Sequence, residues 1–283
     1  MNAPHVKAIE ILKVQGNSIA AKPDLLAIEE PLEIRLLHGP EGGRLEQSIS
    51  VTMRTPGHDE ELVLGFLWTE GIIHSYDQVY SIRHCETVEK PEEEGNVIKV
   101  NMQPDVTIDM AALERHFYTS SSCGVCGKSS IDAVFQSCSF EISDASPWLS
   151  PASIHPLPDR LREAQKVFEY TGGIHAAGLF DKEGNLLLMR EDVGRHNALD
   201  KLVGAALASG LLPLSQHVIQ VSGRASFELV QKALMAGAEV MAAVGAPSSL
   251  AVSLAQKSNM TLLGFVRNER FNIYTGAERF ERA

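Results

Sequence analysis

The sequence predicts an α/β protein, with a layered α/β domain in its C-terminal half and a smaller α+β domain before it. Two patterns predict this division. From Gly173 onward, two strands around a turn are followed by strict alternation of single helices and buried strands, which favours parallel pairing through crossover helices. Before residue 119, short strand-like runs are separated by turn residues, as in antiparallel hairpins. We therefore expect domains at 1–118 and 131–283, joined by a mobile loop at 119–130.

The C-terminal elements follow from hydrophobic spacing and turn residues. Strands at 174–180 and 186–190 flank the turn Asp181–Asn185, and the helix at 196–207 is expected to end at Gly210. Beyond it, we expect strands and helices in alternation at 218–221, 226–236, 240–244, 248–257 and 262–266, with one more strand at 271–274.

The N-terminal elements are shorter. Strands at 33–37 and 45–53 surround a glycine-rich turn, and further strands are expected at 79–83 and 97–102. A helix at 60–69 has apolar residues at helical spacing, with Asp59 as its N-cap and Gly71 as its stop. The Pro-rich segment 146–158 should be irregular and 159–170 an amphipathic helix. Residues 1–31 and those beyond Gly276 carry no motif.

Composition excludes several classes of protein. A chain of 283 residues with 44% hydrophobic residues can bury a large core, and its net charge of -11 argues against non-specific binding to nucleic acid. No run approaches the ~18 apolar residues of a membrane span, and the first residues do not resemble a secretion signal. We therefore expect a cytoplasmic protein that meets any anionic ligand with a local basic pocket.

The sharpest chemical feature is the pair Cys123 and Cys126 in a Ser- and Gly-rich loop. A nucleophilic cysteine must be a thiolate, whose pKa is lowered by a nearby cation such as Lys128 or by the N-terminus of a helix. Gly124 and Gly127 relax the backbone, so either sulfur can move towards a partner. This arrangement favours a carrier, with Cys123 and Cys126 as the catalytic residues and no residue predicted as a metal ligand.

Two other interpretations of the cysteine pair stay open. A Cys-x-x-Cys is half of a structural zinc site, although no second half with zinc-ribbon spacing is present. A thioredoxin-like dithiol would normally follow a strand and open a long helix, which this loop does not. Cys85 and Cys138 are most simply interpreted as small buried hydrophobic residues.

A second constellation lies at the strand-to-helix junctions of the C-terminal half. The three junctions carry Arg195, Arg224 and the segment 245–249, and parallel strands bring such turns to one edge of a sheet. Helix N-termini and arginines there can hold a pyrophosphate, although ordinary capping would explain any one turn alone.

The run 264–271 adds Arg267 and Arg270 around a turn, with Phe265 and Phe271 available to stack on a planar ring. A solvated surface turn is the alternative.

Taken together, these motifs resemble the formate dehydrogenase accessory sulfurtransferases, the FdhD family. The resemblance runs from about residue 60 to Thr275. It is carried by motifs in the family's order, namely Glu70–Ile73, Cys123–Gly127, Glu191–His196 with Ala198–Lys201, Ser222–Ser226 and Gly264–Thr275.

The resemblance implies a cytoplasmic homodimer whose C-terminal domain has a fold like that of cytidine deaminases. It implies a protein that takes sulfur from a cysteine desulfurase as a persulfide on Cys123, with Cys126 as companion. The sulfur passes to the molybdenum bis-guanine-dinucleotide cofactor, for use by formate dehydrogenase. The cofactor, or a guanine nucleotide such as GDP, is expected at the turn formed by Phe265, Val266, Arg267, Asn268, Glu269 and Arg270, with Arg224 and Arg195.

Three rival functions compete with this one, and the sequence disfavours the first. A zinc deaminase requires His-x-Glu followed by Pro-Cys-x-x-Cys, but His175 is followed by two alanines and lies after the cysteines. His175 can still line a pocket, although a structural histidine is the simpler interpretation. A cofactor-binding chaperone without sulfur transfer and a zinc-stabilised module are the other two.

Overall fold

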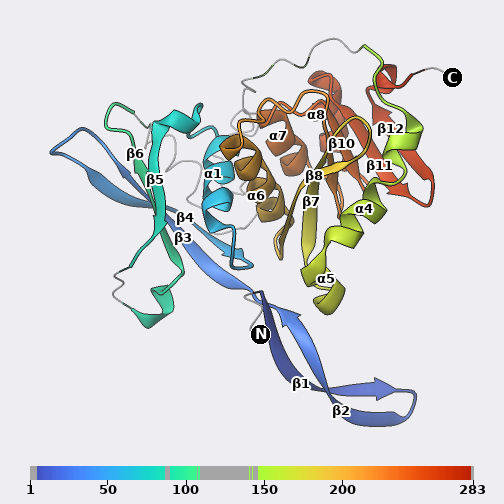
Figure 1. Cartoon of the computed structure of the whole chain (residues 1–283), viewed down its shortest axis with the longest axis horizontal. Coiled ribbons are helices and arrows are strands. Elements are labelled where there is room, and N and C mark those ends of the chain that lie inside the picture. The colour runs from blue at the N-terminus through green and yellow to red at the C-terminus, as the bar shows by residue number, and fades with distance from the viewer. Residues whose placement is uncertain are drawn as a thin grey trace.

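The computed structural model describes residues 5–86, 90–106 and 146–281, together with residues 108, 140 and 142. Within them the chain forms a two-stranded, a four-stranded and a six-stranded sheet, with helices between and around the two larger sheets (Figure 1). The predicted α/β class is confirmed in this coarse sense. No helix in these ranges is long and apolar enough to cross a membrane.

The four-stranded sheet has the order β4-β3-β6-β5. Its strands are β3 (Glu30–His38), β4 (Leu45–Arg54), β5 (Val79–His84) and β6 (Val97–Met102), as predicted to within a few residues. Short 3-10 turns at Tyr76–Gln78 and Pro91–Glu93 precede β5 and β6. Helix α1 (Asp59–Thr69) follows β4, but its N-cap is His58. The prediction of Asp59 as the cap was wrong, because the Asp59 carboxylate instead accepts two hydrogen bonds from Arg54.

The six-stranded sheet has the order β12-β11-β10-β9-β7-β8. Strands β9 (Val218–Val221), β10 (Val240–Ala243) and β11 (Thr261–Arg267) are parallel, as expected from the intervening helices α7 (Phe227–Met235) and α8 (Ser249–Lys257). Strands β7 (His175–Phe180) and β12 (Arg270–Thr275) run antiparallel to their neighbours, because tight turns join β7 to β8 (Leu186–Asp192) and β11 to β12. The sheet is therefore mixed, and the predicted parallel pairing holds for β9, β10 and β11 only.

The segment before β7 differs most from its prediction. The irregular stretch contains α3 (Pro151–Ile154), and the single expected helix is two helices, α4 (Leu157–Ala164) and α5 (Lys166–Thr171). They meet at buried Gln165, whose ψ of 82° is not helical. The Glu191 carboxylate accepts the N–H groups of Val167 and Phe168, so a side chain distant in sequence caps the second helix.

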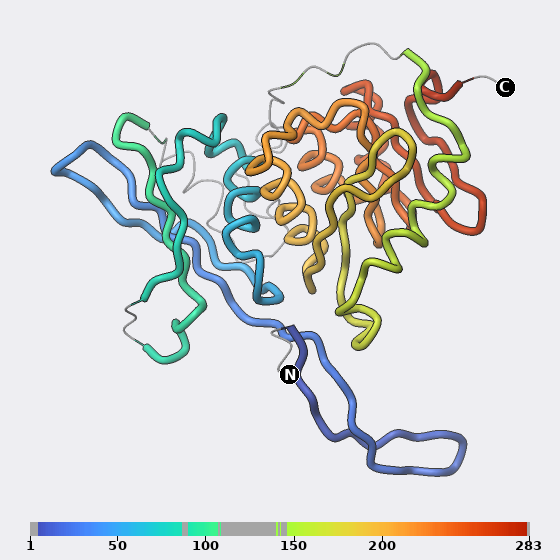
Figure 2. Tube along the Cα trace, viewed as in Figure 1, coloured from blue at the N-terminus to red at the C-terminus, as the bar shows by residue number. Residues whose placement is uncertain are grey.

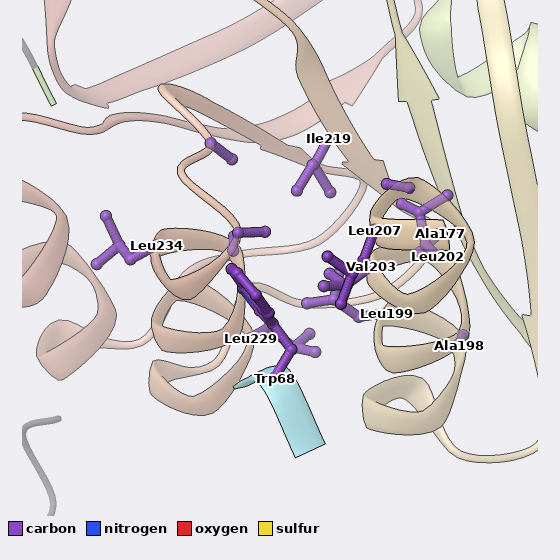
Figure 3. Close-up of a cluster of buried hydrophobic side chains, with 14 of the residues drawn as sticks. Trp68, Ala177, Ala198, Leu199, Leu202, Val203, Leu207, Ile219, Leu229 and Leu234 are labelled. Atoms are coloured by element: carbon purple, nitrogen blue, oxygen red, sulfur yellow. The ribbon is translucent and has the colours of Figure 1, made fainter. Parts of the chain in front are cut away.

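One hydrophobic core joins the two larger sheets. Helices α1, α6 (Arg195–Ala208) and α7 lie between them, where Trp68 is close to Leu199, Leu202 and Leu229 (Figure 3). Leu234, on the other side of α7, belongs to the same core. A smaller core on the far face of the six-stranded sheet is covered by α3, α4 and Phe280. The expected domain boundaries near residues 118 and 131 lie outside the described residues and stay predictions.

The closest approach in this core is between α1 and α6, at Gly65 and Gly204. A Cβ atom on Gly65 would overlap the backbone oxygen of Asp200, and one on Gly204 would overlap the backbone oxygen of Glu61. The two helix backbones are therefore in direct contact, which only glycine permits. This contact sets how the four-stranded sheet is seated on the C-terminal half.

The first two strands form an arm that the sequence did not predict. Strands β1 (Val6–Gln15) and β2 (Ser18–Ala27) pair along their whole length and extend away from the body (Figures 1 and 2). Leu12 and Ile19, near the tip, are 72% and 66% exposed. The base of the arm is held by His5, whose carbonyl accepts the Ile28 N–H.

Replacing Gly65 by Ala should lower the free energy of unfolding by ~3 kcal/mol or more, because the added carbon must push two backbones apart. This loss would outweigh the gain in helix propensity, which favours Ala by roughly 1 kcal/mol. Urea unfolding followed by circular dichroism measures the change. Gly43→Ala is the control, since its Cβ would meet Pro40 at an ordinary 3.7 Å. Equal stability of the two variants would contradict a close α1–α6 contact.

Candidate site at the carboxyl edge of the six-stranded sheet

The predicted strand-to-helix turns do meet at one edge of the six-stranded sheet. Backbone hydrogen bonds link them in a row, from Gly245 N to Gly223 O (2.9 Å) and from Phe265 N to Gly245 O (3.1 Å). Ser222 joins the row to β7, because its hydroxyl accepts the Ala176 N–H at 2.9 Å. The turns at 222–226 and 245–249 and the start of the β11–β12 hairpin therefore form one continuous surface, and the turn at 190–196 lies at the same edge beyond β7.

Two of the three helices that begin at this edge have no side-chain cap. Gly194 precedes α6 and cannot provide one, and Ser226 precedes α7 without accepting a cap hydrogen bond, whereas Ser248 does cap α8. The buried Arg195 Nε and Ser226 Oγ also lack hydrogen-bond partners among the described residues. Free N–H groups at helix N-termini and a guanidinium with an unused donor suit an anion.

His175 lies near Arg195 and beside Gly223, the residue before Arg224. The His175 ring lies over Gly223, and burial, with the positive charge of Arg195, lowers the pKa of the imidazole. His175 is therefore uncharged at neutral pH, so its ring adds no positive charge to this edge of the sheet. Arg224 is exposed and packs along Gly245. A zinc deaminase needs a glutamate two residues after this histidine, and that position is occupied by the fully buried Ala177.

The β11–β12 turn has an unusual backbone. Asn268 and Glu269 both have φ near +55°, which is the geometry of a type I′ hairpin turn, and Phe265 has a φ of 54° at a bulge in β11. A positive φ in a bulky aromatic residue is strained. Arg267 and Arg270 lie directly opposite each other, an arrangement that is unfavourable without an anion between them.

The structure distinguishes among the residues predicted at this turn. Arg267, Asn268, Glu269 and Arg270 are exposed, and the Arg267 guanidinium lies 5.9 Å from the centre of the Phe265 ring. The Val266 side chain is fully buried in the smaller core, so only its backbone is open to a ligand.

Phe271, expected to stack on a planar ligand, is already packed. It stacks on Phe280 at 5.6 Å and contacts His155 at 5.3 Å between ring centres. That expectation was wrong, because the second strand of the hairpin folds back onto the smaller core.

Of the four cysteines, only Cys85 lies within the described residues. Cys123 and Cys126 lie outside the described residues, as does Cys138, so their predicted roles stay predictions. Cys85 is a free thiol at the end of β5 and is only half-buried, so it is not the fully buried residue that was expected. In the described part of the chain, no group of three or more His, Cys, Asp or Glu side chains could hold a metal ion.

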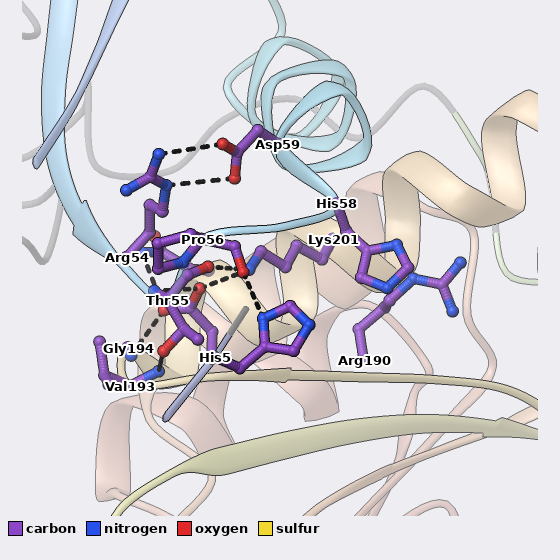
Figure 4. A network of polar contacts seen from close by, with 12 residues as sticks. His5, Arg54, Thr55, Pro56, His58, Asp59, Arg190, Val193, Gly194 and Lys201 are labelled. Carbon is purple, nitrogen blue, oxygen red and sulfur yellow. Dashed lines mark hydrogen bonds and ion pairs between the residues drawn. The ribbon is translucent and has the colours of Figure 1, made fainter. Parts of the chain in front are cut away.

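The segment from Glu191 to Lys201 has a second role that the sequence did not reveal. Asp192 and Lys201, both almost fully buried, form an ion pair of 2.7 Å. Lys201 also donates to the Thr55 carbonyl at 2.8 Å, and Asp192 accepts the Thr55 N–H at 3.1 Å (Figure 4). Asn197 donates to the Met53 carbonyl at 2.8 Å. These contacts hold β4 and the turn that follows it against α6. The i, i+4 spacing of Asn197 and Lys201 was the only signal of a shared face.

A second buried cluster connects α1, α6 and α7. The Lys232 ammonium contacts Asp200 at 3.0 Å and Glu70 at 2.9 Å, and Thr69 donates to Asp200 at 2.7 Å. Burial raises the pKa of Asp200 to about 6, whereas both carboxylates raise the pKa of Lys232. His196 is also buried there, and desolvation lowers its pKa to about 4.

Comparison with known proteins gives consistent results. Residues 27–281 match the model of the FdhD/NarQ family. The chain is 50% identical over 273 residues to a sulfur carrier protein FdhD of Streptomyces avermitilis, covering 95% of this chain and 94% of the relative. It is 39% identical over 274 residues to the protein of that name in Sulfurisphaera tokodaii, covering 97% and 98%.

A solved structure has the same fold. It is that of a protein from Desulfotalea psychrophila described as a formate dehydrogenase accessory protein, with a TM-score of 0.72 and 23% identity. The match covers 98% of this chain and all of the other.

Replacing Lys201 by Met should lower the free energy of unfolding by ~3–5 kcal/mol, because it leaves the Asp192 carboxylate buried and unpaired. Adding Asp192→Asn should restore at least half of that loss. Lys182→Met, at the exposed β7–β8 turn, is the control and should change stability by less than ~0.5 kcal/mol. Thermal and urea unfolding measure all three. A double variant no more stable than the single variant would contradict the ion-pair interpretation.

Proposed function

The chain belongs to the FdhD/NarQ family, and from this membership we propose that it is a sulfur carrier that serves the maturation of a formate dehydrogenase. Two relatives with high coverage bear the name sulfur carrier protein, and the solved structure with the same fold is described as a formate dehydrogenase accessory protein. The observation that carries the proposal on this chain is the pair Cys123 and Cys126 in a glycine-flanked segment.

The proposed chemistry is a two-step transfer. The Cys123 thiolate attacks the outer sulfur of a persulfide on a cysteine desulfurase, the sulfur–sulfur bond of the donor breaks, and the donor leaves as a thiolate. Cys123 then carries the persulfide. When the Cys126 thiolate attacks the inner sulfur of Cys123, a disulfide forms and hydrosulfide is released to the acceptor. A cellular dithiol reductant then restores both thiols.

The proposed acceptor is the molybdenum bis-guanine-dinucleotide cofactor, bound at the carboxyl edge of the six-stranded sheet. The uncapped N-termini of α6 and α7, the unused donor of Arg195 and the exposed Arg224 favour a phosphate-bearing ligand there. The facing Arg267 and Arg270 add positive charge beside the Phe265 ring. A guanine nucleotide such as GDP would occupy the same groups.

The remaining expectations form part of the same proposal. We propose a cytoplasmic homodimer whose C-terminal domain has a cytidine-deaminase-like fold. A mixed sheet with helices on both faces is compatible with that assignment. The net charge of -11 supports protein and cofactor partners rather than nucleic acid.

Two variants separate sulfur loading from cofactor binding. Cys123→Ala should abolish persulfide formation after incubation with a cysteine desulfurase and cysteine, detected by mass spectrometry as the absence of one added sulfur atom. It should leave the Kd for GDP unchanged. Arg224→Ala should weaken GDP binding about tenfold or more, because it removes a charged hydrogen bond, and should leave loading intact.

The rival functions predict different results. A cofactor-binding chaperone would show GDP binding but no added sulfur on the wild-type loop peptide. A zinc-stabilised module would retain about one zinc ion per chain when purified without chelator. Either result would contradict sulfur transfer by Cys123.

A further inference from the structure

A separate cavity of about 290 Å³ lies beside the edge strand β8, where the turn between β4 and α1 meets the C-terminal half. Strand β8 is four strands away from β11 in the sheet, or about 19 Å at the usual strand spacing. The cavity is therefore distinct from the β11–β12 turn. Its polar lining consists mainly of His5, His58, Lys166, Arg190, Glu191 and Lys201.

The cavity has a buried cation in its wall. Lys201 is 1% exposed, and its described contacts with Asp192 and the Thr55 carbonyl use two of the three N–H donors of the ammonium group. One donor therefore remains for a ligand. Buried ammonium groups are costly unless their donors are used, so this donor favours an acceptor inside the cavity.

The neighbouring carboxylates already have hydrogen-bond partners. Glu61 binds Arg190 in a bidentate pair, Asp192 pairs with Lys201, and Glu191 accepts the first N–H groups of α5. Lys166 lies exposed at the rim with no ion pair to any described residue. The donors of the Lys166 ammonium group are therefore open to an anionic ligand.

The walls are held in place before any ligand enters. Figure 4 shows His5, His58, Arg190 and Lys201 gathered around the turn at Thr55 and Pro56. The His5 Nδ1 donates to the Pro56 carbonyl at 2.7 Å. Gly57, with a φ of 96°, leaves room for the His5 ring, since a Cβ there would lie 2.6 Å from the ring. A site whose donors are already oriented loses little entropy on binding.

We propose that this cavity binds the phosphate group of a compact ligand. Lys201, Arg190 and Lys166 approach from the α6, β8 and α5 sides, and the three terminal oxygens of a phosphate can accept from all three, which the two oxygens of a carboxylate cannot. Val167, Ile174 and Met189 provide apolar wall for a small organic part. The volume suits a phosphate monoester and is too small for a whole guanine dinucleotide.

The phosphate could belong to a free small molecule or to one end of the proposed cofactor. The site itself does not rest on the proposed function, because its donors are defined by the cavity alone. Both sources share the same recognition chemistry, and competition separates them.

The test uses the full chain and inorganic pyrophosphate as the probe, with binding followed by calorimetry in the Arg224→Ala background, in which the other proposed anion site is weakened. Lys166→Gln should weaken pyrophosphate binding about tenfold, as expected for a charged hydrogen bond. Lys182→Gln, in the turn at the other end of β8, is the matched control and should leave the Kd unchanged. Equal effects of the two substitutions, or no pyrophosphate binding at millimolar concentration, would overturn the proposal.

GDP then identifies the source of the phosphate. If saturating GDP displaces pyrophosphate in the Arg224→Ala background, the cavity accepts a nucleotide phosphate, consistent with one end of the cofactor. If GDP leaves pyrophosphate binding unchanged, the cavity takes a separate small phosphate ester. Both results support the site and are independent of persulfide formation on Cys123, so failure of the site and failure of sulfur transfer can be distinguished.

Discussion

The contact between α1 and α6 at Gly65 and Gly204 is the constraint on which the rest of the structure depends. Because the two helix backbones touch, α1 carries the four-stranded sheet into a fixed position on the C-terminal half. The same approach lets the Thr69 hydroxyl donate to Asp200 and lets Lys201 reach the backbone carbonyl of Thr55. A spacing larger by one methyl group would separate these polar partners and leave buried charges unpaired.

Buried ions then make the junction specific. Hydrophobic packing alone would tolerate small shifts of α1 along α6, but the ion pair of Asp192 with Lys201 and the cluster around Lys232 satisfy their donors and acceptors in one register only. The cavity beside β8 follows from this junction, because Lys201 both binds Asp192 and lines its wall. The proposed anion site and the seating of the N-terminal sheet therefore depend on the same residue.

The surface that faces ligands is locally positive in an acidic chain. With a net charge of -11, the molecule as a whole repels anions, and only clustered arginines, lysines and helix N-termini can attract them. Both proposed anion sites lie at the carboxyl edge of the six-stranded sheet, one near β11 and one near β8. That edge is where parallel strands direct the N-termini of the following helices, so topology and charge act together.

The sequence alone determined the features that depend on neighbours along the chain. Hydrophobic periodicity predicted most strands and helices, glycine and proline predicted the turns, and the cysteine pair with the ordered motifs predicted the family. Only the tertiary structure decided that the sheet is mixed, that Glu191 divides one expected helix into two, that Val266 and Phe271 face a core, and that Asp192 and Lys201 hold two halves together. Each of these depends on a partner far away in sequence, and a local pattern contains no information about which distant group will satisfy a buried charge or an open helix end.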